Sequence, residues 1–295
     1  MKALVLIAMT SASCAGFIED RAAATTFGVL EKSQIAAKRQ SDVELARAAV
    51  PGGLLQLEAF ALAYPAHRGF KTLHAEALCQ FAAAFVFDDW EHAKLTSSAD
   101  ADRLAERVVR LGAQCTEANL ALLSKDWRAA RIAGETAWAE RLAKATRAET
   151  GPLRWIATSD ALALALAPLA RIGTLPTIDA TLRRVIALAP GEHDSDAELL
   201  LGTLEAGRSA FLGGPNGQEL FDRARAQLGP GALLAEVMYV RGVAVATKDR
   251  ALFTQTLERV LAADLDAWPD RRLANELARV KAKRYLAAID VLIPE

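Results

Sequence analysis

Residues 104–122, LAERVVRLGAQCTEANLAL, carry an apolar residue at every third or fourth position. An α-helix turns once every 3.6 residues, so Leu104, Val108, Leu111 and Cys115 lie on one helix face. Comparable stripes occupy residues 70–85, 178–189, 233–244 and 253–260. No apolar run with the period of two that is typical of a β-strand is comparably clear. The sequence therefore predicts an all-α protein.

Composition agrees with this prediction and narrows the range of partners. Hydrophobic residues make up 52% and charged residues 24% of the 295 residues, which allows a sizeable core. The formal net charge is -1, and charges of both signs are interleaved along the chain. A surface of this kind does not attract a phosphate backbone, so we expect no nucleic-acid partner.

Proline and glycine divide the stripes into helix-sized segments. The predicted breakers are Pro51-Gly52-Gly53, Pro65, Gly151-Pro152, Pro176, Pro190-Gly191, Gly213-Gly214-Pro215, Gly229-Pro230-Gly231 and Trp268-Pro269. Several follow similar apolar segments, which suggests antiparallel helix pairs of the tetratricopeptide kind. The period is irregular, with about 40 residues between Pro190 and Pro230. We therefore predict degenerate tetratricopeptide-like helical hairpins stacked into a curved solenoid, with function on its concave surface.

Two features refine the predicted domain. Gly202, Ala206 and Ala210 form a small-residue face at four-residue spacing, which lets a neighbouring helix approach closely. Residues 100–147 depart from the repeat pattern with two longer helices, and we interpret them as an insertion or a packing helix pair within one domain. No linker rich in Pro, Ser or Gly indicates a second domain, so residues 41–295 are predicted to form one.

The N-terminus has the features of an export signal. A basic residue precedes an apolar run over residues 3–9, which is shorter than the roughly 20 residues of a membrane-spanning helix. Thr10-Ser11-Ala12-Ser13-Cys14 resembles a bacterial lipobox, in which the cysteine is acylated. We predict a signal peptide over residues 1–13, lipid attachment at Cys14 and a tether over residues 14–40. Ordinary signal-peptide cleavage, or a short apolar helix in a cytosolic protein, are the alternatives.

The two remaining cysteines, Cys79 and Cys115, each lie in an apolar helical stripe. Buried free thiols are the favoured interpretation. A disulfide remains open in an oxidising compartment, on condition that the two Cα atoms lie within about 7 Å of each other.

Motifs for catalysis or metal binding are weak in this sequence. Gly202–Ser209 comes within one residue of a phosphate-binding P-loop, but residues 199–211 have the pattern of a continuous helix. His74-Ala75-Glu76 lacks the Pro-Cys-x-x-Cys partner of zinc deaminases. The acidic run Asp88–His92 is expected to be a solvated helix end rather than a cation site. We predict no enzyme, no cofactor and no metal, with a cryptic hydrolase as the alternative from another class.

Candidate binding residues are aromatic or conformational. Tryptophan is enriched at interfaces, so Trp90 and Trp155 are candidate ligand or partner contacts. The alternative is that both fill gaps between helices. Gly213, Gly214 and Pro215 allow an unusual backbone path that would shape a pore mouth, with an ordinary loop as the alternative.

From about Ser41 to the C-terminus, the order of features resembles the T-component (TatT) family of tripartite ATP-independent periplasmic (TRAP) transporters. The blocks that carry the resemblance are Leu182–Pro190, Leu199–Gly202, Gly213–Pro215 leading to Phe221–Ala224, Lys248–Arg250 followed by Phe253, Arg272–Asn275 leading to Lys281-Ala282, and Trp155 in a small-residue helix. These blocks are specific in combination, and most lie in the C-terminal half.

The resemblance implies a homotrimeric periplasmic lipoprotein that binds the transporter's solute-binding P-component. It implies no catalytic residue, contact with the membrane only through the lipid anchor, and a hydrophobic ligand in a pore or groove. Ala15, where sorting to the inner membrane would require Asp, indicates the inner leaflet of the outer membrane. A general envelope scaffold with the same fold is the alternative.

Overall fold

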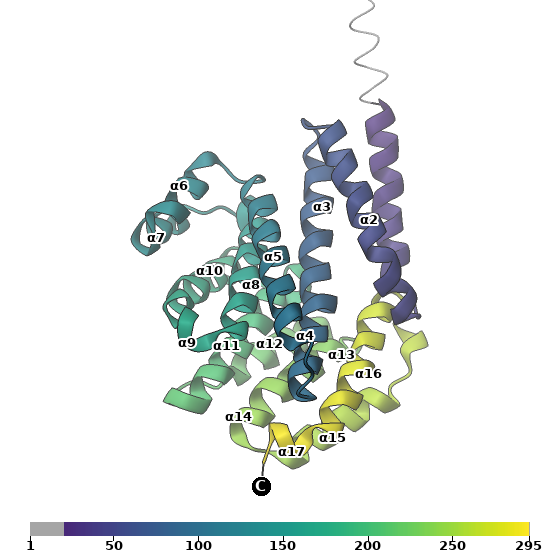
Figure 1. The fold of residues 1–295 in the computed structure, drawn as a ribbon, viewed down its shortest axis with the longest axis vertical. Helices are drawn as coiled ribbons and strands as arrows, with labels where there is room; N and C mark the ends of the chain where they lie inside the picture. The colour runs from purple at the N-terminus through teal and green to yellow at the C-terminus, as the bar shows by residue number, and fades with distance from the viewer. Residues whose placement is uncertain (1–20, 295) are drawn as a thin grey trace, which may run out of the picture.

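The structure is a computed structural model that describes residues 21–294 (Figure 1). Its longer helices are residues 21–38, α2 (Val43–Ala63), α3 (Arg68–Phe81), α4 (Phe87–Leu95), α5 (Ala101–Leu120), α6 (Lys125–Ala133), α7 (Glu135–Ala143), α8 (Thr150–Leu166), α10 (Leu175–Leu188), α11 (Asp196–Leu212), α12 (Gln218–Leu228), α13 (Leu233–Tyr239), α15 (Arg250–Ala262) and α16 (Arg272–Ala287). The short ones are α9 (Pro168–Arg171), α14 (Val245–Thr247) and α17 (Ile289–Leu292), the π-helical η1 (Ala82–Val86) and η5 (Val240–Ala244), and the 3-10 turns η2 (Arg147–Glu149), η3 (Ile172–Thr174), η4 (His193–Ser195), η6 (Leu265–Ala267) and η7 (Pro269–Arg271). Residues 21–294 contain no strand, which confirms the all-α prediction.

The apolar stripe that begins at Leu104 forms the buried face of helix α5. Leu104, Val108 and Cys115 are at most 8% exposed. Glu106 and Arg110 form an exposed ion pair one turn apart. The buried face packs against α3 and α4 on one side and against α8 on the other, so α5 is central to the N-terminal half.

The helices follow one another as packed neighbours, and the last long helix returns to the first part of the chain. α8 packs on α10, α10 on α11, and α11 on α12 and α13. α15 and α16 pack against α13, and α16 also contacts α2 (Figure 1). Sequence neighbours therefore form packed helix pairs. Their arrangement as a tetratricopeptide-like solenoid stays a prediction.

Most predicted breakers lie just after a helix or in the first turn of one, and the exception lies in the middle of α2. Gly213 and Gly229 follow α11 and α12 with φ of 70° and 72°, in the left-handed region that glycine tolerates. The predicted break at Pro51-Gly52-Gly53 is wrong, because α2 continues through it. Ala46 and Leu57, on either side of the proline, are both buried against the core. That packing outweighs the local helix propensity.

The segment predicted as an insertion forms three helices, α5 to α7, rather than two long ones. Trp127 and Trp138 pack edge to face with ring centroids 5.1 Å apart. The indole N–H of Trp127 donates to Glu149 at 2.7 Å, and that of Trp138 donates to Thr181 at 2.9 Å. These two tryptophans fasten α6 and α7 to the turn before α8 and to α10.

The small-residue face of α11 does allow close approach. A Cβ atom added to Gly202 would lie 3.0 Å from the ring of Phe221 on α12. The same ring lies against Gly242 of η5, whose nearest neighbours include Ala206. Glycine at position 202 is therefore needed for the contact between α11 and α12, and the P-loop-like sequence around it is helical.

Cys79 and Cys115 form a disulfide between α3 and α5, with Cα atoms 5.2 Å apart. The favoured interpretation of free thiols is therefore wrong, because sequence spacing does not reveal the distance between two helices. The Asn119 side-chain amide donates to the sulfur of Cys79 at 3.2 Å and to the carbonyl of Cys115 at 2.9 Å.

The predicted signal peptide and Cys14 lie outside the described residues. The described part of the predicted tether is helical over residues 21–38. Its Phe27 ring packs edge-on against Phe70 of α3, with centroids 5.6 Å apart, and Ala23 is 3% exposed. This segment thus contacts the helical body, although the predicted domain boundaries stay a prediction.

Candidate functional site

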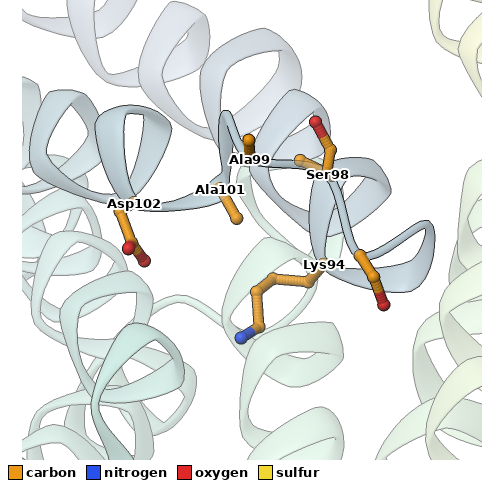
Figure 2. Close-up of a pocket in the computed structure, with 7 residues that line it drawn as sticks. Lys94, Ser98, Ala99, Ala101 and Asp102 are labelled. Carbon is orange, nitrogen blue, oxygen red and sulfur yellow. The ribbon is translucent and has the colours of Figure 1, made fainter.

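A cavity of about 280 Å³ opens at the turn between α4 and α5 (Figure 2). Its lining residues are Ala93, Lys94, Ser97, Ser98, Ala99, Ala101 and Asp102. Lys94 and Asp102 extend toward the same space from the two helices, as Figure 2 shows. Ser97 has φ of 53°, which turns the chain sharply between α4 and α5. The cavity therefore presents one ammonium group and one carboxylate, whereas the Ser98 hydroxyl points away from the space between them in Figure 2.

Trp90 is the predicted site residue nearest to this cavity. Its ring is half-buried and packs against Ala93, Ala101 and Leu104, the first two of which line the cavity. The ring of Phe87 lies 5.0 Å away, centroid to centroid. Trp90 therefore supports the wall of the cavity and does not line it.

The charged side chains of Lys94 and Asp102 make the cavity polar. An ammonium and a carboxylate at opposite sides suit a small polar or zwitterionic molecule. Across residues 21–294, no three His, Cys, Asp or Glu side chains converge as metal ligands would.

Trp155 lies in the interior, beside the disulfide. Its side chain is 5% exposed and packs with Leu78, Cys79 and Cys115. The guanidinium of Arg154 lies 4.2 Å from the centroid of its ring. The indole N–H is buried and has no hydrogen-bond partner among the described residues. A ligand contact at Trp155 would have to be made from inside the helical body, and its binding role stays a prediction.

Arg154 extends from the same region toward the surface. Its side chain is 5% exposed and forms an ion pair with Asp196 at the start of α11. Burial raises the pKa of Asp196 to about 6, against the opposing effect of Arg154. Burial and the charge of Arg154 lower the pKa of the neighbouring His193.

Gly213, Gly214 and Pro215 form an exposed loop after α11. Gly213 and Gly214 have φ of 70° and 95°, which side chains rarely adopt. No other predicted site residue within residues 21–294 lies in this loop, so the structure does not join it with Trp90 or Trp155 into one site.

A buried charge network between α4 and α16 was missed by the sequence interpretation. Asp88 was expected at a solvated helix end, yet it is 2% exposed. The amine of Lys281 lies 2.6 Å from one of its carboxylate oxygens, and the guanidinium of Arg284 lies 2.6 Å from the other. Burial opposes ionisation of Asp88, but Lys281 and Arg284 outweigh it and lower its pKa.

Glu91 extends this charge network by one helical turn. It lies 3.3 Å from both Lys281 and Arg241, and it accepts a 2.6 Å hydrogen bond from the Tyr285 hydroxyl. Despite its burial, these partners lower the pKa of Glu91. Burial and the neighbouring Glu91 carboxylate raise the pKa of Tyr285, which keeps the hydroxyl a donor. The network joins residues about 190 positions apart in sequence and holds α16 against α4.

A family model described as TRAP transporter T-component matches residues 39–292. This chain belongs to that family. The match spans nearly all described residues and confirms the resemblance that the sequence carries. No curated protein matches the chain. As a family, T-components are accessory components of transport and are not known as enzymes.

In this T-component, two residues from the blocks that carry the resemblance have clear structural roles. Asp249 accepts a hydrogen bond from the backbone N–H of Leu252 and so caps α15. Asn275 is 1% exposed, donates to the carbonyl of Gly231 at 3.1 Å and accepts from the N–H of Leu233 at 3.2 Å. In this chain, Asp249 thus acts as a helix cap, and Asn275 joins α16 to the segment before α13.

Within residues 21–294, no helix of the T-component combines the length and apolar character that crossing a bilayer requires.

Proposed function

We propose that this T-component works in the periplasm as a lipid-anchored homotrimer that binds the solute-binding P-component of a TRAP transporter. The family match over residues 39–292 carries the proposal. The lipid anchor would be attached to Cys14 and inserted in the inner leaflet of the outer membrane. Membrane contact would then run only through the lipid.

The disulfide between Cys79 and Cys115 supports an exported location. Disulfides persist in oxidising compartments such as the periplasm and are rare in the cytosol. The order of a basic residue, an apolar run and small residues before Cys14 supports the same location.

We further propose that the protein holds a ligand passively, in a pore or groove, while other transporter components supply the energy. Trp90 is one proposed contact; its half-buried ring packs behind the wall of the cavity at the α4–α5 turn. Trp155 and the Gly213–Pro215 loop are the other proposed contacts. The hydrophobic ligand implied by the resemblance would suit the tryptophans better than the polar cavity.

The decisive experiment is reversible crosslinking in intact cells of the native host, followed by purification of the full-length protein under denaturing conditions. We expect the solute-binding protein of a TRAP transporter to be the main crosslinked partner. A Cys14→Ala variant, which cannot be acylated, serves as the control for the anchor and should lose membrane association. Recovery of envelope assembly factors without any solute-binding protein would favour the scaffold alternative.

A further inference from the structure

The loop between α11 and α12 contains an asparagine that is followed by glycine. The chain has three asparagines, Asn119, Asn216 and Asn275, and Asn216 alone precedes a glycine. Asn119 and Asn275 lie within α5 and α16 and are each 1% exposed. Asn216 is half-buried, directly after the exposed Gly213–Pro215 loop. It therefore differs from the other two in its neighbour and in its access to water.

The side-chain carbonyl of Asn216 is bound to the start of α12. The backbone N–H of Gln218, the first residue of α12, donates to its Oδ1 at 3.2 Å. The N-terminus of a helix carries a partial positive charge. A donor placed there polarises the carbonyl and stabilises negative charge that develops on its oxygen. This arrangement favours nucleophilic attack on the Cγ atom of Asn216.

The main-chain nitrogen of Gly217 is the nucleophile that lies close at hand. Four covalent bonds separate it from the Cγ atom of Asn216, so a bond between the two closes a five-membered ring. The hydrogen bond from Gln218 closes a short turn through the same atoms and holds the side chain against the main chain. Gly217 has no side chain to obstruct the approach.

We propose that Asn216 is a site of spontaneous deamidation. The Gly217 nitrogen gives up its proton and bonds to the Cγ atom of Asn216. The bond from Cγ to the side-chain amide nitrogen breaks, and that nitrogen takes up a proton and leaves as ammonia. Water then opens the cyclic imide at one of its two carbonyl carbons. This modification site goes beyond the proposed function and does not depend on it.

The two hydrolysis products have different consequences for the fold. The carbonyl of Gly217 accepts from the backbone N–H groups of Leu220 and Phe221, and a Cβ atom added to Gly217 would collide with the carbonyl of Gly202. An isoaspartyl residue adds one main-chain atom directly before this contact and should loosen α12 from α11. An aspartyl residue keeps the main chain and places a negative charge at the N-terminus of α12, where it is favourable.

The chemistry can be tested on the purified full-length protein, incubated folded in water labelled with heavy oxygen. Digestion with trypsin in ordinary water then restricts the label to conversion during the incubation. We expect at least about tenfold more label in the peptide of residues 209–223 than in the peptides with Asn119 or Asn275, whose amides are hydrogen-bonded inside helices. Asn216→Gln is the matched control and should take up far less label, because its reaction needs a six-membered ring.

The contribution of the fold can be measured against a synthetic peptide of residues 209–223. The donor at the start of α12 should let the folded protein react at least as fast as the peptide. A folded protein that reacts much more slowly than the peptide would overturn the proposal. Equal labelling of Asn216 and Asn119 in the folded protein would overturn it as well.

The structural consequence can be tested by urea denaturation of the incubated protein. Enzymatic methylation of the free α-carboxylate identifies the isoaspartyl fraction after ion-exchange chromatography. This fraction should unfold at a lower urea concentration than the unmodified protein, whereas Asn216→Asp should not. Equal midpoints for the isoaspartyl and unmodified proteins would contradict the expected loosening of α12.

Discussion

Two regions of the molecule join helices that are distant in sequence, and they do so by opposite chemistry. Between α3 and α5, the Cys79–Cys115 disulfide lies in apolar surroundings with Trp155 packed against it. Between α4 and α16, Asp88 and Glu91 are held by cationic side chains. The first link is covalent and depends on the redox potential of the compartment. The second link depends on every buried charge having a partner of opposite sign. Removal of one group leaves the others buried without that partner, which lowers the free energy of unfolding.

The largest effect is expected from Asp88→Ala in the charge network. Lys281 and Arg284, which are 16% and 22% exposed, would lose the carboxylate that both contact. Breaking a buried pair on one side should lower the free energy of unfolding by about 3 kcal/mol, measured by urea denaturation. Asp89→Asn is the matched control. Its partly exposed carboxylate pairs with Arg47, so the loss should stay below about 1 kcal/mol. Similar losses for both variants would contradict the assignment.

A comparable effect is expected from removing the disulfide. The Cys79→Ala, Cys115→Ala double variant opens a loop whose ends are 36 residues apart. The free energy of unfolding should fall by about 3 to 4 kcal/mol, chiefly because the unfolded chain gains freedom. A reducing agent should destabilise the wild-type protein by a similar amount and leave the double variant unchanged. Sensitivity of the double variant to reductant would show that another thiol is responsible.

The smallest effect is a difference in acid sensitivity between the two regions. The pKa values of Asp88 and Glu91 are lowered in the folded state. Their contribution is therefore complete above the unfolded values near 4 and is lost as the pH falls through the lowered ones. Glu91→Gln should reduce the loss of stability as the pH falls below about 4 in urea titrations, whereas the Cys79 and Cys115 variant should retain that loss. Asp196 changes the pH dependence of stability in the opposite direction, because its pKa is raised to about 6. The effect of Asp196 falls mainly above the pH range in which Asp88 and Glu91 are protonated. An unchanged slope for Glu91→Gln would contradict the prediction.

Local pattern was enough to predict the helices and the close approach at Gly202. Apolar periodicity depends on neighbours within one or two turns, and the stripe from Leu104 to Cys115 carries that information directly. The combined blocks of the C-terminal half were also sufficient to indicate the family. Asp249 and Asn275 belong to these blocks, and the structure explains them as a helix cap and a buried amide.

Tertiary structure alone decided which distant residues meet. The pairing of Cys79 with Cys115 and the burial of Asp88 both depend on distances between helices, which no local spacing encodes. Likewise, α2 continues through Pro51 because packing on the core outweighs local propensity. The sequence thus determined where helices form, since helix formation is governed by short-range periodicity. The folded chain determined which charges, sulfurs and apolar faces find a partner, because that depends on contacts between segments far apart in sequence.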